Sequence, residues 1–389
     1  MKTAIALVAV LAATPALAQV NQAPPNAPNQ KPVFDNQTRA PELSDGVAVR
    51  QQVVIRGLDS PWGLALLPDG AWLITEKPGR MRLFADGALS EPLKGLPKVD
   101  ARGQGGLLDV AVAPDFAQSR RVWFSYAEPR EGGKNGTAVA TGTLSADGTA
   151  LEGVEVIFRQ DPAWASDKHF GSRIVPDGRG GIFVTTGERS VIDARPLAQD
   201  VNTHLGKVLH IDGKTGAPLS GNPFAQGGGK PEIWSWGHRN IQSAALDRQG
   251  RLWTVEHGAK GGDELNRPEA GKNYGWPVIT YGVEYSGKTI GKGLTQAEGM
   301  EQPVYYWDPV IAPSGMAIYD GAMFPEMRGD ILIGGLKSAS VVRLKLQGDR
   351  VAGEQHLAQG IGRVRDVAVA SDGALMVLTD EGALVRLAR

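Results

Sequence analysis

A stretch near the start of the chain, SPWGLALLPDGAWLITEKPGRMRLF at residues 60–84, decides the fold. It predicts an apolar strand, a Pro-Asp-Gly turn, a second apolar strand that ends in Thr-Glu, a further turn and a third strand. Strands that alternate with Asp/Gly turns are typical of antiparallel hairpins and meanders. A single meander leaves its apolar faces exposed, so similar units elsewhere in the chain have to cover them.

The same pattern recurs in five later stretches. They lie at residues 106–126, 171–188, 242–258, 314–346 and 364–387. Units that repeat at spacings of about 40 residues and upward indicate a propeller or an array. We therefore predict an all-β fold, a six-bladed β-propeller of four-stranded antiparallel blades around a central channel. Two α/β domains are the alternative, but the crossover helices that they require are missing from the pattern.

The composition narrows the class of ligand. The chain has 389 residues, a net charge of −1 and no cysteine. A near-neutral chain without a long run of one charge argues against nucleic acid and anionic membrane surfaces as partners. Without cysteine neither a disulfide nor a thiolate metal site can form. Any bound metal then takes oxygen or imidazole ligands, which favours hard cations such as calcium.

The N-terminus indicates export. Residues 1–18 carry a lysine, an apolar run and a final Ala-Leu-Ala, which predicts a secretory signal peptide cleaved after Ala18. The apolar run is too short to span a membrane. Residues 19–45 are rich in Pro, Asn and Gln and predict a flexible leader, and residues 46–389 predict a single propeller domain. In a bacterium, the expected location of the mature protein is the periplasm.

Polar side chains recur at one position of the repeat, just before the first strand of a unit. They are Gln104, His169, Arg239 with Asn240, and Arg363 with Arg365. A propeller gathers these positions around one mouth of its channel, where Lys337 adds a further cation. Converging like charges repel one another unless an anion binds, and guanidinium groups pair with carboxylates in a bidentate way. The pattern predicts a small, flat or compact ligand with several negative charges.

The segment EHGAKGGDELNRPEAGKNYGWP, residues 256–277, has a different character. Asp263 and Glu264 lie among glycines and offer oxygen ligands of the kind that calcium prefers. The alternating acidic positions of an EF-hand loop are missing, so a solvated acidic turn is the other interpretation.

Together these motifs resemble one known family, the soluble pyrroloquinoline-quinone (PQQ)-dependent sugar dehydrogenases, which include bacterial aldose sugar dehydrogenases and soluble glucose dehydrogenase. The resemblance runs from about Arg50 to the C-terminus. It is carried by SPWGLALLPDG, GQGGLLDVAVAPDF, HFGSRIVPDG, WSWGHRNIQ, EHGAKGGDELN, GKNYGWP, IAPSG and GRVRDVAVASDG.

The resemblance implies a six-bladed propeller enzyme that oxidises the C1 hydroxyl of aldoses to lactones, with hydride transfer to PQQ and electrons passed to an external acceptor. His169 matches the family's general base, and Arg239 lies near the reactive carbonyls of the quinone. The other positions that match cofactor contacts are Gln104, Asn240, Lys337, Arg363 and Arg365.

The same resemblance implies that the protein binds calcium. Backbone carbonyls at the positions of Gly258 and Ala259 match those that hold the calcium ion beside the quinone. A second, structural calcium is implied at Asp263, Glu264 and Tyr274.

Departures from soluble glucose dehydrogenase favour the aldose sugar dehydrogenase branch. Lys168 replaces an aspartate before the base, so the acid that would orient His169 is missing there, and Asp167 is the candidate to replace it. His257 replaces a glutamine near the quinone and either lines the pocket or packs against its loop. Asp308-Pro309-Val310 stands where glucose dehydrogenase has Trp-Pro-Thr. The other four histidines gain no role from their positions.

Two rival functions remain open. A calcium-dependent propeller lactonase or esterase would need several carboxylates and an asparagine around a metal in the channel. A secreted interaction propeller would use the cations to recognise an acidic partner surface. The expected partners of the enzyme are an aldose and an external electron acceptor, with no nucleic acid and no membrane insertion, and a monomer is the default.

Overall fold

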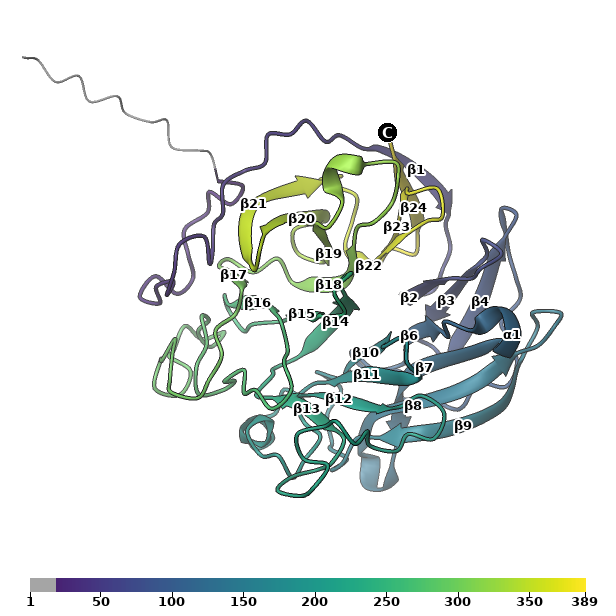
Figure 1. Cartoon of the computed structure of the whole chain (residues 1–389), viewed down its shortest axis with the longest axis horizontal. Coiled ribbons are helices and arrows are strands. Elements are labelled where there is room, and N and C mark those ends of the chain that lie inside the picture. Colours follow the sequence, from purple (N-terminus) through teal and green to yellow (C-terminus); the bar gives the residue numbers. More distant parts are fainter. Residues whose placement is uncertain (1–18) are drawn as a thin grey trace, which may run out of the picture.

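The computed structural model describes residues 19–389, so the predicted signal peptide at residues 1–18 lies outside the described residues. The described chain forms six four-stranded antiparallel sheets arranged as blades around a central channel (Figure 1). Its helical parts are one short helix, α1 (Phe116–Ser119), and three 3-10 turns. The predicted six-bladed propeller is confirmed, and two α/β domains are excluded. No helix within residues 19–389 is long and apolar enough to cross a bilayer.

The blades follow the order of the chain. Blade 1 contains β2 (Pro61–Leu66), β3 (Trp72–Glu76), β4 (Arg80–Ala85) and β5 (Ala88–Leu89); blade 2 contains β6 (Leu107–Val112), β7 (Arg121–Pro129), β8 (Asn135–Leu144) and β9 (Leu151–Arg159). Blade 3 contains β10 (Gly171–Pro176), β11 (Gly181–Thr186), β12 (Lys207–Asp212) and β13 (Ile233–Trp236); blade 4 contains β14 (Ile241–Leu246), β15 (Leu252–Glu256), β16 (Asp263–Asn266) and β17 (Tyr305–Trp307). Blade 5 contains β18 (Pro313–Ile318), β19 (Ile331–Gly335), β20 (Ser340–Gln347) and β21 (Arg350–Leu357); blade 6 contains β22 (Val364–Val369), β23 (Leu375–Thr379), β24 (Leu384–Ala388) and β1 (Arg50–Ile55).

The repeated Asp-Gly pair explains the tight turn between the first two strands of a blade. In blade 1 the carboxylate of Asp69 accepts a hydrogen bond from the backbone N–H of Ala71 at 3.1 Å, and Gly70 has a φ of +91° that suits glycine. In blade 3 Asp177 accepts in the same way from Gly181 at 2.9 Å. Hydrophobic clusters then fill the space between neighbouring blades, where each fully buried large side chain contributes about 1.5–3 kcal/mol.

The first strands, β2, β6, β10, β14, β18 and β22, pack side by side around the channel (Figure 1). In every blade the pairing between first and second strand shifts register close to the start of the first strand. A bulge of this kind turns a side chain away from the regular alternation and often lies beside a functional site. The same mouth of the channel therefore receives side chains from all six blades.

The ring closes through its two ends. Strand β1, from the N-terminal side, pairs antiparallel with β24, the last strand of the chain, with Arg50 opposite Ala388 and Val53 opposite Val385 (Figure 1). Closure covers the exposed edges that an open row of blades would leave.

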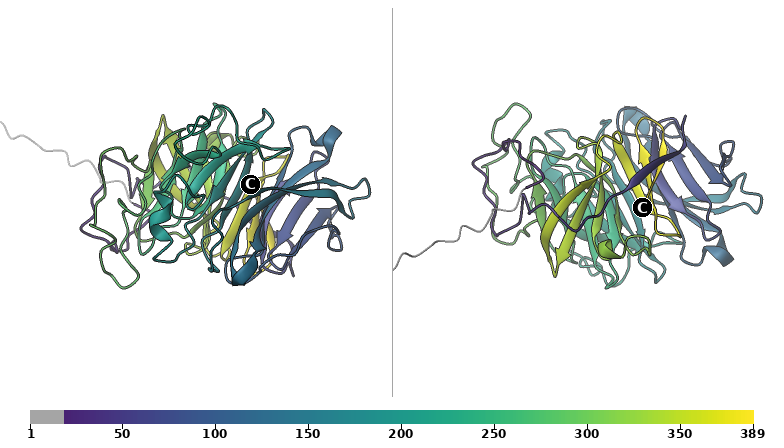
Figure 2. Two further views of the ribbon diagram at one scale, coloured as in Figure 1. Left: turned by 90° about the horizontal axis from the view of Figure 1, so that it is seen from below. Right: turned by 90° about the horizontal axis from the view of Figure 1, so that it is seen from above.

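Residues 19–45, predicted as a flexible leader, instead pack on blades 4 and 5 along the rim of the ring (Figure 2). The backbone N–H groups of Asn26 and Ala27 donate to the two carboxylate oxygens of Asp308, each at 2.8 Å. Gln37 is fully buried and donates to the carbonyl of Pro303 at 3.0 Å. The prediction of flexibility was wrong because the polar side chains that suggested it satisfy buried groups of the propeller.

Candidate active site

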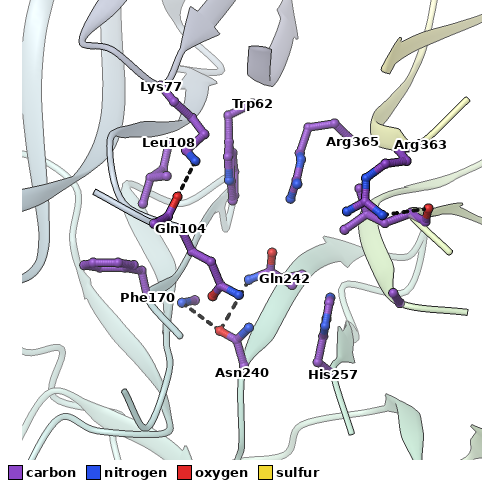
Figure 3. Close-up of a pocket in the computed structure, with 14 residues that line it drawn as sticks. Trp62, Lys77, Gln104, Leu108, Phe170, Asn240, Gln242, His257, Arg363 and Arg365 are labelled. Carbon is purple, nitrogen blue, oxygen red and sulfur yellow. Dashed lines mark hydrogen bonds between the residues drawn. The ribbon is translucent and has the colours of Figure 1, made fainter. Parts of the chain in front are cut away.

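A cavity of about 270 Å³ lies at the mouth of the channel where the first strands begin (Figure 3). Every blade contributes to its wall. The lining residues are Trp62, Lys77, Gly103, Gln104, Leu108, Phe170, Gly171, Asn240, Gln242, His257, Ala312, Leu336, Arg363 and Arg365. Of the residues selected from the sequence, Gln104, Asn240, His257, Arg363 and Arg365 come together here. None of the lining residues is acidic.

His169 lies directly before the lining residues Phe170 and Gly171, and only 5% of its surface is exposed. Its backbone N–H donates to Oε1 of Gln104 at 2.8 Å, and its Nδ1 lies 2.5 Å from Oε1 of Glu188. A carboxylate only accepts hydrogen bonds, so Nδ1 carries the proton and the lone pair of the neutral ring lies on Nε2. The residue has a φ of +50°, a left-handed conformation that a non-glycine residue adopts only when its surroundings enforce it.

The surroundings of His169 keep its ring neutral. Burial, with the positive charges of Arg239, Arg189 and Lys168, holds the pKa of His169 well below its ordinary value of 6.5. Burial also raises the pKa of Glu188 above its ordinary value. At neutral pH the imidazole is therefore ready to accept a proton at Nε2.

Glu188 is the acid that orients His169, a role that the sequence left open because Lys168 stands where an aspartate was expected. Asp167 does not orient the base, since its backbone carbonyl instead accepts from the backbone N–H of Gln104 at 2.7 Å. A repeat signal could have found Glu188, because the second strand of several blades ends in or near a glutamate. In blade 4 strand β15 ends at Glu256, two positions earlier in the register than Glu188, and Glu256 also accepts from a histidine, Nδ1 of His238, at 2.9 Å.

Arg239 lies beside this cavity rather than in its wall. Its guanidinium donates to the carbonyl oxygens of His257, at 3.1 Å, and of Gly258, and it lies 5.1 Å from the ring centre of Trp276. Within residues 19–389 no carboxylate forms a direct ion pair with this guanidinium, and its buried Nε has no acceptor. Its positive charge acts on the buried carboxylates of Glu188 and Asp263, where it opposes the rise in pKa that burial causes.

His257 both lines the cavity and packs against blade 5. Its Nε2 lies 2.6 Å from the carbonyl oxygen of Pro313, so Nε2 carries the proton and Nδ1 is the acceptor. Burial lowers the pKa of His257 to about 3. The ring is a neutral hydrogen-bonding group at any physiological pH.

The two arginines of blade 6 share a carboxylate partner, which the sequence did not indicate. Arg363 and Arg365 both donate to the carboxylate of Asp380, at 3.0 Å and 2.8 Å. One negative charge thus faces two positive charges. Lys337 is exposed and is absent from the lining, to which its neighbour Leu336 contributes.

Lys77, which sequence reasoning missed, lines the cavity from blade 1 and donates through Nζ to the carbonyl of Gly103 at 2.6 Å (Figure 3). It directly follows the glutamate that ends β3, and His257 follows the glutamate that ends β15. The two residues therefore occupy the same position in two blades. This position follows the second strand of the blade, whereas most of the polar residues that recur in the sequence stand before the first strand.

The loop after β15 offers backbone oxygens to a metal. The backbone N–H of Gly258 donates to Asp263 at 2.8 Å, and an added Cβ at Gly258 would lie 2.3 Å from the carbonyl oxygen of Gly261. Only glycine allows this tight loop, with the buried Ala259 following it. The carbonyl of Gly258 accepts from the guanidinium of Arg239. A backbone carbonyl is the kind of oxygen ligand that calcium takes, and a bound ion would have to displace this guanidinium.

The three side chains expected around a structural calcium do not all have free oxygens. The carboxylate of Asp263 accepts from the backbone N–H groups of Gly258 and Ala312, each at 2.8 Å. The hydroxyl of Tyr274 donates to the carbonyl of Arg267 at 2.6 Å. These hydrogen bonds hold the loops in place, and the roles of Asp263 and Tyr274 as calcium ligands stay predictions.

Glu264 does face a possible cation position. With Glu256, Gly262, Thr280 and the cation Arg239 it borders a cavity of about 10 Å³, near the space of a single water or ion. Burial and the repulsion from Glu256 raise the pKa of Glu264 well above its usual range, a crowding that a divalent cation would relieve. No group of three or more acidic, histidine or cysteine side chains in residues 19–389 could hold a metal, so backbone oxygens would have to complete the site.

The floor of the channel is closed by a buried ion network. Arg173 donates to Asp109 at 2.8 Å and to Asp366 at 3.3 Å, and it lies 4.7 Å from the ring centre of Trp62, which lines the cavity. The remaining histidines bond within the protein, as expected of residues without a site role. They are His204, His210, His238 and His356.

A family model described as glucose/sorbosone dehydrogenase matches residues 58–386, which include strands of all six blades and the entire cavity wall. The chain belongs to this family. Membership in the glucose/sorbosone dehydrogenase family makes it a sugar dehydrogenase and agrees with the resemblance seen in the sequence.

Three relatives of the family are informative. The chain is 46% identical over 340 residues to the aldose sugar dehydrogenase YliI of Escherichia coli strain K12, covering 86% of this chain and 90% of the relative. The crystal structure of the soluble aldose sugar dehydrogenase of Escherichia coli in its apo-form is similar with a TM-score of 0.83 and 44% identity, covering 88% and 99% of the two chains. The PQQ-bound aldose sugar dehydrogenase of Streptomyces coelicolor is similar with a TM-score of 0.73 and 29% identity, covering 87% and 98%.

Proposed function

We propose that this member of the glucose/sorbosone dehydrogenase family oxidises the C1 hydroxyl of aldose sugars to lactones, with PQQ and calcium as cofactors, and passes the electrons to an external acceptor. The observation that carries the proposal is a neutral, buried His169, held by Glu188, at the edge of a cavity whose charged lining residues are all cations. The identity to the Escherichia coli aldose sugar dehydrogenase and the similarity to the PQQ-bound Streptomyces enzyme support it.

The residues present fit a flat, multiply negative cofactor. Arg363 and Arg365 share a single carboxylate, so blade 6 keeps a net positive charge toward the cavity. Asn240 and Gln104 add amide groups, and Trp62 and Phe170 add aromatic surface. PQQ, when bound, supplies the hydride acceptor, and calcium supplies a Lewis acid beside it.

The proton chemistry belongs to His169. In the proposed reaction its Nε2 takes the proton of the C1 hydroxyl while hydride leaves C1, a role that typically contributes roughly 10²- to 10⁴-fold to the rate. Glu188 stabilises the imidazolium that forms, through the proton on Nδ1. Gln104 fixes the backbone of His169. The guanidinium of Arg239, which forms no direct ion pair within residues 19–389, stabilises negative charge that develops beside it during the reaction.

Calcium would be held by two loops of blade 4. The carbonyl of Gly258, and with it that of Ala259, would hold the ion beside the cofactor, and Glu264 would supply the side-chain ligand for the structural ion. Both loops depend on Asp263, whose hydrogen bonds join residue 258 to residue 312.

The test is a titration of purified, metal-stripped protein with PQQ, with and without calcium, followed by the absorption of the quinone and by dye reduction with several aldoses. The expected result is stoichiometric, calcium-dependent binding and sugar-driven dye reduction, with a lactone as product. Absence of PQQ binding would overturn the proposal.

The rival enzyme, a calcium-dependent lactonase, would need carboxylates at the cavity, and none lines it. Asp109 and Asp366 lie near the channel axis but are paired with Arg173. We also propose that the mature protein is a periplasmic monomer. Fractionation of cells and sedimentation of the purified protein test these two points.

A further inference from the structure

Lys77 stands out among the residues of the cavity because no role follows for it from the family resemblance. In Figure 3 Lys77, Trp62 and Arg365 stand along one side of the cavity, and Asn240 and His257 stand on the opposite side. Its side chain is half-buried. One of the three ammonium protons of Lys77 goes to the carbonyl of Gly103. Within residues 19–389 no other hydrogen bond from this ammonium is present.

The charges around Lys77 differ from those around the neighbouring arginines. Arg363 and Arg365 both have Asp380 as a partner. No carboxylate among the described residues forms an ion pair with Lys77; burial and the repulsion from Arg365 lower its pKa, and the more distant charge of Asp380 offsets this only in part. Lys77 is therefore the cavity-lining cation that lacks a carboxylate partner.

From this geometry we propose that Lys77 binds a carboxylate group of the ligand in the cavity. The proposal rests on the proposed function for one source of that group, a carboxylate of PQQ. The other source is a sugar that itself carries a carboxylate, such as a uronic acid. A charge-assisted hydrogen bond from an ammonium group to a carboxylate is stronger than a neutral one, and burial strengthens it further.

The position of Lys77 also links the carboxylate group of the bound ligand to the proposed base, His169. Lys77 holds the carbonyl of Gly103, the next residue is Gln104, and Oε1 of Gln104 accepts from the backbone of His169. Lys77 thus acts on ligand binding directly and on His169 as a positioning residue through one loop.

The experiment separates charge from loop support by comparing Lys77→Gln, which keeps a donor for Gly103, with Lys77→Arg, which keeps the charge. The matched control is Lys98→Gln, an exposed lysine in the connection between blades 1 and 2. Each variant is titrated with PQQ in the presence of calcium at several salt concentrations, with quinone absorption as the readout. Benzene-1,3,5-tricarboxylate, a flat tricarboxylate without redox chemistry, serves as a second probe through the rise in melting temperature that it causes.

We expect Lys77→Gln to weaken PQQ binding about 10- to 100-fold and to reduce its salt dependence. The tricarboxylate should stabilise Lys77→Gln less than the wild type, while Lys77→Arg and Lys98→Gln stay within about threefold of the wild type in PQQ affinity. An unchanged PQQ affinity with a selective loss of activity on glucuronic acid relative to glucose would assign Lys77 to the sugar carboxylate. Unchanged behaviour toward PQQ, tricarboxylate and glucuronic acid would overturn the proposal.

If the proposed PQQ-dependent function is wrong, the result differs from the result expected if only the proposal for Lys77 is wrong. The wild type itself would then not bind PQQ, and the tricarboxylate probe would still test Lys77. Tricarboxylate stabilisation that depends on Lys77 supports the proposal in that case, and equal stabilisation of wild type and Lys77→Gln overturns it.

Discussion

Nδ1 of His169 and Oε1 of Glu188 lie 2.5 Å apart, and both side chains are almost completely buried. The two residues flank the open end of the β10–β11 hairpin of blade 3, one just before the first strand and the other just after the second. The pairing directs the free Nε2 of the imidazole away from Glu188. The chemistry of the site depends on this orientation.

His169→Ala should remove most turnover, by about 10²- to 10⁴-fold, because it removes the base whose ring Glu188 orients. Glu188→Gln keeps a hydrogen-bond acceptor for Nδ1 but loses the charge that stabilises the imidazolium, so kcat should fall about 10- to 100-fold. Steady-state kinetics with quinone-loaded protein measure both effects. PQQ affinity, measured by absorption, should change little in either variant. Near-normal turnover of His169→Ala would contradict its role as the base.

The losses of activity caused by His169→Ala and Glu188→Gln should not be additive. Once His169 is absent, Glu188 has no imidazolium to stabilise, so Glu188→Gln in the His169→Ala background should cost little further activity. Fully additive losses would show that Glu188 acts independently of the histidine.

The acid limb of the pH profile should lie below pH 6.5. His169 acts in its neutral form, and burial with the nearby cations lowers its pKa, so the neutral form persists to lower pH than for a free imidazole. Lys168→Met removes one of these cations, which raises the pKa and moves the limb toward neutral pH. Lys214→Met, an exposed lysine at the other end of blade 3, is the control. A limb that stays in place in Lys168→Met would show that the histidine does not set it.

Calcium should be required for reconstitution. EDTA treatment before PQQ is added should block activity, and added calcium should restore it. Glu264→Gln removes the carboxylate charge at the small cavity of blade 4 and should raise the calcium concentration needed for half-maximal stabilisation against heat by about tenfold or more. Glu298→Gln, a change at an exposed position, is the control. Activity that is insensitive to EDTA would contradict the metal role.

The fold was predictable because its signals are local and repeated. The Pro-Asp-Gly turns recur, and the Asp69 and Asp177 side chains close them in the structure as their type requires. The convergence of Gln104, Asn240 and Arg363 was predictable as well, since a propeller places equivalent positions at one mouth.

What escaped prediction depends on contacts between distant segments. Glu188 and Lys77 follow second strands, and their importance appears only when the hairpin brings the strand ends together. The charge of Arg363 looked free in sequence because its partner Asp380 lies in another strand-end loop of blade 6. The segment at residues 19–45 looked flexible because its partner Asp308 lies 282 positions after Asn26.

The contacts of residues 19–45 with the propeller should contribute to the stability of the fold. Deleting residues 19–45 removes the backbone N–H donors of Asn26 and Ala27 from the carboxylate of Asp308 and the buried contacts of Gln37 with the propeller. The loss of these hydrogen bonds and of the covered surface should destabilise the fold by roughly 3 kcal/mol or more, measured as a lower denaturant midpoint.

Deletion of residues 19–45 should also affect the loop after Gly258, which is proposed to bind calcium. An added Cβ at Gly261 would lie 2.8 Å from Oδ1 of Asp308, and the backbone N–H of Gly262 donates to Trp307 at 2.9 Å, so the N-terminal segment supports the turn that follows Gly258 from outside. Asp308→Ala should therefore weaken calcium-dependent PQQ binding as well as stability, whereas the exposed Asp320→Ala should change neither. If the deletion lowers stability but leaves PQQ affinity and its calcium dependence unchanged, the segment only anchors blades 4 and 5. A parallel loss of both would show that the N-terminus helps to hold the cofactor loop, because the turn at Gly261 packs directly against the carboxylate that the segment binds.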